Sequence, residues 1–364
     1  MQMLRLSGLV LGASIALPGA GFAQTTTIGV AGPLTGQYAS FGQQLRNGAE
    51  LAAADINAAG GVLGKKITLE YGDDACDPKQ ARAVAERFAY EQVPFVAGHF
   101  CSSSSIPASE AYADGDVLQI TPASTNPTFT ERGLWNTFRV CGRDDQQGAV
   151  AGAYLARHFG GKDIAILHDK STYGKGLADQ TKKALNEAGV KEKLYEAYTQ
   201  GERDFNALVS RLKAAAIDVV YVGGYHTEAG LILRQMRDQG LPAQMMSGDA
   251  IPNNEFWSIT GPAGEGMLFT FGPDPRKKPT AAAVVKRFRE HRSGGIHALR
   301  VCGAPDMEPR GGQGRRGQGQ QGCRHPEDRH HTVLGPISYT PKGDVTKIDF
   351  VVYRWNKDGT YSEL

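Results

Sequence analysis

The chain has 364 residues, of which 41% are hydrophobic and 21% charged, with 46 glycines and 18 prolines. This length predicts two domains, and the composition excludes an intrinsically disordered, collagen-like or coiled-coil protein. The 40 lysines and arginines against 38 aspartates and glutamates give a net charge of +2, which provides no electrostatic reason to expect binding to nucleic acid or to acidic membranes.

Residues 1–23 have the pattern of a secretory signal peptide. Arg5 precedes the apolar stretch Leu9–Leu17, and the small residues Gly21 and Ala23 stand where a signal peptidase requires them. The apolar stretch is too short to span a membrane, and no later segment is long and apolar enough to do so. An N-terminal strand or helix is the alternative. We therefore expect a periplasmic protein that begins at about Gln24 and whose cysteines can oxidise.

The next part of the chain alternates between strand and helix patterns. Strands are predicted at 27–31, 66–71, 93–98 and 117–121, with an extended segment at 136–141; helices are predicted at 43–59, 78–92, 105–114 and 149–159. Asp77 is a suitable N-cap for the second of these helices because Pro78 follows it at the first helical position.

The same alternation restarts in the second half. Strands are predicted at 164–167, 194–198, 219–222 and 244–246, and helices at 175–188, 205–215 and 228–239. Such alternation with short connections predicts an α/β protein with parallel sheets covered by helices on both faces. Two sets of about five units indicate two doubly wound, Rossmann-like lobes, with a ligand cleft between them at the carboxyl ends of the strands.

Common catalytic signatures are absent from the sequence. It contains no phosphate loop, no His-Glu-x-x-His and no Gly-x-Ser-x-Gly elbow, so we predict no catalytic residue, no metal site and no cofactor. His168, Asp169 and Ser171 are close in sequence, but a catalytic triad is defined by geometry and not by neighbouring positions. An exported α/β hydrolase or amidase that uses the serines near Ser102 is kept as the alternative function.

Polar residues follow several of the predicted strands. Ser102–Ser105 open a predicted helix, where hydroxyls and free amides bind anions such as a carboxylate; ordinary helix capping would account for only one of these serines. The other strand ends are at 121–127, 168–174, 223–226 and 247–249. A carboxylate cradle from one lobe, with aromatic side chains and one acid from the other, suits a zwitterion such as an α-amino acid.

Five stretches then indicate a family: DDACDPKQA at 73–81, GHFCSSS at 98–104, HDKSTYGKG at 168–176, GGYH at 223–226 and TVLGPI at 332–337. Together they resemble the periplasmic branched-chain amino-acid binding proteins, the leucine/isoleucine/valine class of type I periplasmic binding proteins that serve ABC importers. The resemblance covers 27–292 and 332–359.

The resemblance implies a receptor that closes its two lobes on a branched-chain or related aliphatic α-amino acid and delivers it to an ABC permease. It implies three hinge crossovers, with 24–142 and about 271–331 in the N-terminal lobe, and 143–270 and about 332–364 in the C-terminal lobe. We expect a monomer that binds no nucleic acid. A sensory domain for the same ligand is a further possibility, which would require an attached signalling or membrane region.

The resemblance also implies roles for residues at the strand ends. The ligand carboxylate would meet Ser102 and Thr125, with Ala123 beside it and Ser124 in the same loop. The ligand ammonium would meet Asp249 and the carbonyl of Ala123. The family usually has Glu where this chain has Asp249, and the shorter side chain would shift the preferred ligand.

Three aromatic residues and one cysteine pair complete the set implied by the resemblance. Phe41 would wall the side-chain pocket, and Tyr173 and Tyr225 would close it from the other lobe. Cys76 and Cys101 match the disulfide of the family, whereas the residues alone leave the pairing open. Cys141 is expected to be a small buried residue.

The segment 293–331 does not fit this pattern. Its 39 residues include nine glycines, six arginines, four histidines and no aromatic residue. An Arg-Gly nucleic-acid tail and a metal cluster are poor explanations, because an exported protein rarely meets RNA and the Cys and His spacings match no zinc pattern. We expect either an unstructured insert or a pair of compensating frameshifts that replaces a helical part of the first lobe.

Overall fold

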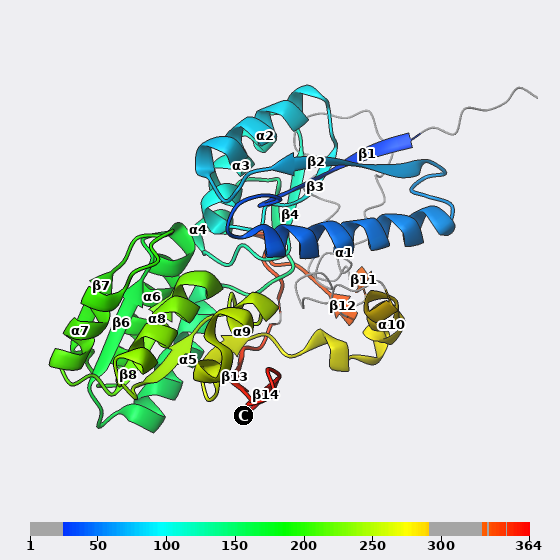
Figure 1. The fold of residues 1–364 in the computed structure, drawn as a ribbon. Coiled ribbons are helices and arrows are strands. Elements are labelled where there is room, and N and C mark those ends of the chain that lie inside the picture. Colours follow the sequence, from blue (N-terminus) through cyan, green and yellow to red (C-terminus); the bar gives the residue numbers. More distant parts are fainter. Residues whose placement is uncertain (1–24, 291–329, 333–334, 347) are drawn as a thin grey trace, which may run out of the picture.

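The computed structural model describes residues 25–290, 330–332, 335–346 and 348–364. It has two α/β lobes, each with a central sheet between helices (Figure 1). The expected signal peptide and nearly all of the anomalous segment 293–331 lie outside the described residues, so these two predictions stay untested. Among the helices that the structure describes, none is both long and apolar enough to cross a membrane.

The first lobe has a five-stranded sheet in the order β2-β1-β3-β4-β5, in which every pairing is parallel. This confirms the parallel sheet predicted for the first half of the chain. The strands are β1 (Thr25–Gly32), β2 (Lys66–Asp73), β3 (Phe95–Gly98), β4 (Leu118–Thr121) and β5 (Thr137–Arg139).

Helices cover both faces of this sheet. One face packs against Leu45 and Ala49, and the other packs against Ala85, Phe88 and Tyr112. The helices are α1 (Ala39–Ala58) on the first face, α2 (Pro78–Tyr90) and α3 (Ser102–Asp114) on the second, and the short α4 (Thr128–Glu131).

The predicted cap of α2 is confirmed. The Asp77 carboxylate accepts hydrogen bonds from the backbone amides of Lys79 and Gln80, at 2.8 and 2.9 Å. Pro78 needs no such partner because it has no amide hydrogen, so the start of this helix is fully defined by its local sequence.

The second lobe has a seven-stranded sheet in the order β14-β13-β10-β9-β8-β6-β7. Five strands are parallel, whereas β13 pairs antiparallel with both β10 and β14. The sequence predicted the parallel strands of this sheet up to β9, and the antiparallel strands β13 and β14 at its edge were not among the predicted strands. The strands are β6 (Ile164–His168), β7 (Leu194–Ala197), β8 (Val219–Gly223), β9 (Gln244–Ser247), β10 (Leu268–Phe271), β13 (Val351–Trp355) and β14 (Tyr361–Glu363).

This second sheet is also covered on both faces. Leu155, Leu177 and Leu185 pack on one face, and Val209 and Leu233 pack on the other. The helices are α5 (Asp144–Phe159) and α6 (Thr172–Glu187) on the first face, α7 (Asn206–Ala214), α8 (His226–Asp238) and α9 (Asn254–Thr260) on the second, and the short 3-10 turn Gly261–Gly264.

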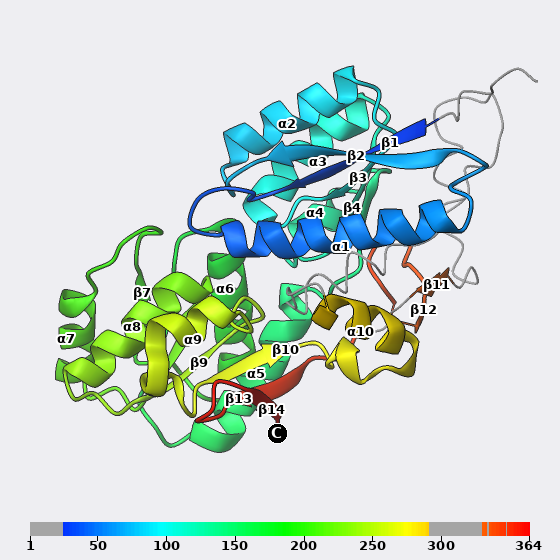
Figure 2. The ribbon, with the colours of Figure 1, turned by 45° about the vertical axis from the view of Figure 1, so that its right-hand side comes forward.

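The chain crosses between the lobes more than once. It leaves the first lobe between β5 and α5, and it returns after β10 through the 3-10 turns Pro275–Lys277 and Pro279–Ala281 to α10 (Ala282–Glu290), where Arg287 pairs with Asp55 of α1. Figure 2 shows α10 beside the two-stranded β11 (His330–Thr332) and β12 (Gly335–Ile337).

The last crossover precedes β13. Tyr339 and Val345 pack with Ile120 and Phe138 of the first lobe, whereas β13 belongs to the second sheet. The segment that contains Tyr339 and Val345 thus packs on the first lobe before the chain reaches β13, and the lobe boundary expected at about 332 stays a prediction.

Candidate ligand-binding site

A small cavity, partly open to solvent, lies between the lobes. Its walls come from the carboxyl ends of β3 and β4 in the first lobe and of β6, β8 and β9 in the second. This is the position at which parallel α/β sheets bind ligands, because helix N-termini and loops converge there. The lining residues are Phe100, Ser102, Ala123, Tyr173, Tyr225, Asp249 and Ala250.

Helix starts position several of these side chains. Ser102 is the first residue of α3, so its hydroxyl and backbone amide lie at the positive end of the helix dipole. Tyr173 lies in the first turn of α6, which is capped by the Ser171 hydroxyl, and Tyr225 is the residue that precedes α8. The backbone therefore fixes where these three side chains enter the cavity.

The predicted cradle loop is built on Thr121. The Thr121 hydroxyl accepts hydrogen bonds from the amides of Ala123 and Ser124, at 3.2 and 3.0 Å, and donates to the carbonyl of His99 at 2.6 Å. The amide of Asn126 then donates to the Ser102 hydroxyl at 3.2 Å. The loop and the start of α3 thus form one hydrogen-bonded unit.

Five of the eight predicted ligand-binding residues line the cavity: Ser102, Ala123, Tyr173, Tyr225 and Asp249. They follow the carboxyl ends of five different strands, and both lobes contribute. Ser102 and Ala123 belong to the first lobe, and the other three residues belong to the second.

The other three predicted residues are buried beside the cavity. Phe41 stacks on Phe100 with ring centroids 4.5 Å apart, and so supports the wall from behind. The Ser124 hydroxyl forms hydrogen bonds inside the first lobe, with the Ser105 hydroxyl and with the carbonyl of Phe100. Thr125 is fully buried, and its hydroxyl has no well-aligned hydrogen bond within the described part of the chain.

Two lining residues were not named from the sequence as ligand-binding. Phe100 directly follows a strand end and lies inside the quoted GHFCSSS stretch, so its position was the available signal. Ala250 follows Asp249 and has no chemical group that could have singled it out. Both are hydrophobic and make the cavity suitable for an aliphatic side chain.

Asp249 is the acidic group of the cavity. It is 3% exposed, and the Tyr173 hydroxyl donates to its Oδ1 atom at 2.9 Å. Burial raises the pKa of the Tyr173 phenol well above its ordinary value, and the nearby charge of Asp249 raises it further. The phenol therefore stays protonated and remains a donor to this carboxylate.

Asp144, the first residue of α5, is a second buried acid close to the cavity. Its carboxyl oxygens make no hydrogen bond of good geometry among the described residues, although the nearby Thr125 hydroxyl favours its charged form. Burial raises its pKa well above the ordinary value, and the charge of Asp249 adds to the rise. Of the two acids, only Asp249 lines the cavity, so its carboxyl group is the one that a ligand cation would meet.

Contacts between the lobes surround the cavity. The Ser40 hydroxyl donates to Glu255 at 2.8 Å and accepts from the Asn253 amide at 2.9 Å. The rings of Tyr38 and Tyr225 lie 4.4 Å apart. The lobes are therefore closed over the cavity.

The disulfide Cys76–Cys101 is present, with the two Cα atoms 5.6 Å apart, and this confirms the expected pairing. It joins the loop after β2 to the residue just before Ser102. Cys141 is buried, as expected, and is not part of this disulfide.

The Ser102 hydroxyl has no catalytic base beside it among the described residues. Its hydrogen bond comes from a backbone amide, and the neighbouring His99 is held by Asp74 at 2.5 Å and Tyr112 at 3.0 Å. A group of three metal-binding side chains does not occur in the described ranges either.

Comparisons with known proteins agree with this architecture. The family model "Periplasmic binding protein" matches residues 25–298. The chain is 48% identical over 370 residues to the Leu/Ile/Val-binding protein homolog 1 of Brucella suis, covering 100% of both chains. It is 50% identical over 372 residues to the Leu/Ile/Val-binding protein homolog 2 of Brucella abortus, covering 98% of this chain and 97% of the relative.

Among solved structures, a leucine binding protein from Thermotoga maritima matches with a TM-score of 0.82 at 24% identity, covering 93% of this chain and 98% of the other. This likeness confirms the predicted fold of two α/β lobes. The relatives are binding proteins, which confirms the prediction that this chain is not an enzyme. By the extent of the family match and of the full-length identity, the chain belongs to the periplasmic binding protein family.

Proposed function

We propose that this protein is an exported receptor that captures leucine, isoleucine, valine or a similar aliphatic α-amino acid and delivers it to an ABC permease. The observation that carries the proposal is the interlobe cavity, which has a hydroxyl at a helix start on one side and a buried carboxylate on the other. The names of the two Brucella relatives support the choice of ligand.

Each end of an α-amino acid has a suitable partner in this arrangement. The Ser102 hydroxyl and the N-terminus of α3 suit the carboxylate, with Thr125 beside them. Asp249, with the carbonyl of Ala123, suits the ammonium. The apolar side chain would then lie against Phe100 and Tyr225, with Phe41 behind.

Asp249 has a shorter side chain than the Glu that is usual in the family, and this difference is expected to affect the ligand preference. The Tyr173 hydroxyl already holds the Asp249 carboxylate at 2.9 Å, which fixes where an ammonium can sit. We expect the protein to act as a monomer in the periplasm after removal of residues 1–23, because both lobes of the site come from one chain.

Calorimetric titration of the full chain with the twenty amino acids, with leucinamide and with the Asp249→Asn variant tests the proposal. We expect leucine, isoleucine or valine to bind, and leucinamide to bind far more weakly. Asp249→Asn is expected to weaken leucine binding by about 2–5 kcal/mol, the usual effect of truncating one partner of a buried charge pair.

Asp114→Asn is the matched control, because Asp114 is exposed at the far end of α3. Equal affinity for leucine and leucinamide would contradict the carboxylate cradle. An unchanged affinity of Asp249→Asn would contradict the ammonium site.

A further inference from the structure

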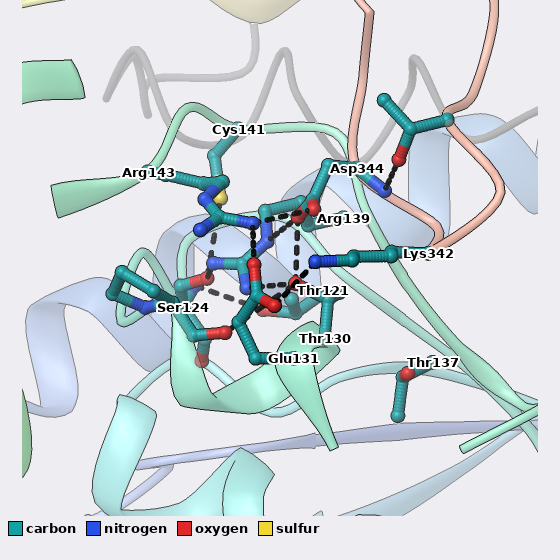
Figure 3. A network of polar contacts seen from close by, with 12 residues as sticks. Thr121, Ser124, Thr130, Glu131, Thr137, Arg139, Cys141, Arg143, Lys342 and Asp344 are labelled. Atoms are coloured by element: carbon teal, nitrogen blue, oxygen red, sulfur yellow. Dashed lines mark hydrogen bonds and ion pairs between the residues drawn. The ribbon is translucent and has the colours of Figure 1, made fainter. Parts of the chain in front are cut away.

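Arg139, the last residue of β5, is buried without any exposed surface. Its guanidinium donates from Nη1 to the carbonyl of Ser124 at 2.5 Å, and from Nη2 to the carbonyl of Asn126 and the hydroxyl of Thr130, both at 3.0 Å. Its Nε atom lies 2.7 Å from Oδ1 of Asp344 (Figure 3). Both Nη atoms therefore make hydrogen bonds, and the Nε atom takes part in an ion pair without a hydrogen bond of good geometry among the described residues.

Two of these contacts fall on either side of a predicted ligand-binding residue. The carbonyls of Ser124 and Asn126 flank Thr125, whose own carbonyl accepts from the amide of Asp144 at 2.9 Å. A planar guanidinium holds two acceptors in a fixed relative geometry. Arg139 thus sets the path of the backbone on both sides of Thr125.

Asp344 fixes the orientation of this guanidinium. It comes from the segment before the last crossover, some 200 residues further along the chain, and it is buried. Its Oδ1 atom also accepts from the Thr130 hydroxyl at 2.8 Å, and its Oδ2 atom pairs with Arg143 at 2.9 Å. A buried arginine without such a partner would be costly, so the acid and the arginine are needed together.

We propose that Arg139 is a positioning residue for carboxylate recognition: it holds the loop 124–126 in the shape that binds the ligand carboxylate, and Asp344 orients it. The inference deepens the proposed function and depends on the cradle of that proposal. Arg139 does not line the cavity, so its effect on binding passes through the loop.

A purely structural ion pair would behave differently. It would stabilise the whole fold, and its loss would weaken the binding of every ligand to a similar degree. A positioning role instead predicts a selective loss for ligands that carry a free carboxylate. The ratio of leucinamide to leucine dissociation constants separates the two roles.

The experiment compares Arg139→Lys, Asp344→Asn and Arg143→Lys in the full chain by calorimetry with leucine and leucinamide. Lysine keeps the charge but cannot bridge both carbonyls. We expect Arg139→Lys to lower leucine affinity at least tenfold and leucinamide affinity less than threefold, and Asp344→Asn to have a smaller effect of the same kind.

Arg143→Lys is the matched control. Arg143 shares Asp344 and also pairs with Glu131 and Asp145, but it makes no contact with the carbonyls of the loop. We expect the ratio of leucinamide to leucine dissociation constants in Arg143→Lys to equal that of the wild type. An Arg139→Lys variant that keeps the wild-type ratio, or that loses both ligands equally, would overturn the inference.

Amide hydrogen exchange in the ligand-free protein tests whether Arg139 holds the loop, independently of any ligand binding. Arg139→Lys is expected to speed exchange at Ser124 and Asn126 at least tenfold, while Arg143→Lys does not. If wild-type protein fails to prefer leucine over leucinamide, the cradle is wrong, yet the exchange result still shows whether Arg139 holds the loop. Equal exchange rates in Arg139→Lys and Arg143→Lys would show that Arg139 does not hold the loop.

Discussion

Three buried acids near the cleft, Asp249, Asp144 and Asp169, have different surroundings. Asp249 accepts from a phenol and faces the cavity, and Asp144 is buried with a raised pKa. Asp169, at the end of β6, has a pKa raised to about 7, chiefly by burial and in part by the charge of Glu228. The amide of Ser171, which donates to it at 2.9 Å, offsets part of this rise.

The raised pKa of Asp169 predicts a pH dependence of stability. The folded protein holds this proton to about pH 7, whereas the unfolded chain releases it near pH 4. Between these values the folded state binds more protons, so the free energy of unfolding falls as the pH rises. Urea unfolding from pH 4 to 8 should show this fall in the wild type and a flatter profile in Asp169→Asn.

The difference between the two profiles is expected to be on the order of a few kcal/mol across the window, since one pKa unit corresponds to about 1.36 kcal/mol. Asp114→Asn, an exposed acid, serves as the control and should follow the wild type. Parallel profiles for wild type and Asp169→Asn would show that Asp169 does not titrate in this way.

At the scale of elements, the sequence predicted the order of strands and helices well and the helix starts poorly. Helix α3 begins at Ser102 and not at 105, α5 at Asp144 and not at 149, and α6 at Thr172 and not at 175. The first turns contain Ser, Asp, Gln and Gly, which carry no apolar periodicity, so the pattern emerges only one turn later.

The functional residues lie in these same first turns. Ser102 and Tyr173 belong to the first turns of α3 and α6, just before the residues at which the periodicity begins. The positions of Ser102 and Tyr173 at strand ends were predictable from the alternation of strands and helices. The ion pair between Arg139 and Asp344 was not predictable, because it joins segments that are distant in the sequence and no local pattern reveals such a contact.

The contact between α5 and α6 depends on a glycine. A Cβ atom at Gly152 of α5 would lie 2.6 Å from Cβ of Ala184 and 2.7 Å from the amide nitrogen of Leu185 in α6. These atoms belong to a rigid helix and cannot rotate away. Gly152→Ala is therefore expected to destabilise the protein by about 1–3 kcal/mol, despite the higher helix propensity of alanine.

Thermal or urea unfolding measures this effect. Gly161→Ala is the matched control, because no described residue lies within 4 Å of the added Cβ atom at that position. We expect the control to change stability by less than about 0.5 kcal/mol. A Gly152→Ala protein as stable as the wild type would mean that the helices can separate without loss.

At the scale of the whole molecule, closure depends on contacts outside the cavity. Ser40 of α1 bonds to Asn253 and Glu255 of the second lobe, and Gln37 donates to Glu228 at 3.1 Å. These bonds join different lobes and break when the lobes separate. They therefore stabilise the closed form without touching a ligand.

Ser40→Ala should consequently speed ligand release. Loss of its two interlobe bonds is expected to cost about 1 kcal/mol in the closed form, which corresponds to about fivefold faster dissociation of leucine in a stopped-flow experiment. Thermal stability without ligand should change little. Gln43→Ala is the control, since Gln43 bonds only within α1, to Asn47 at 2.7 Å. Equal dissociation rates in both variants would contradict the role of Ser40.

The antiparallel strand β13 has a consequence for aggregation. It pairs with β10, so that Phe271 meets Val351, and it joins this sheet only after the chain has passed back through the first lobe. Whenever β13 is detached, β10 presents an unpaired edge, which is where strands of separate molecules can join. A variant that lacks β13 and β14 would keep this edge exposed permanently and would therefore be prone to aggregate.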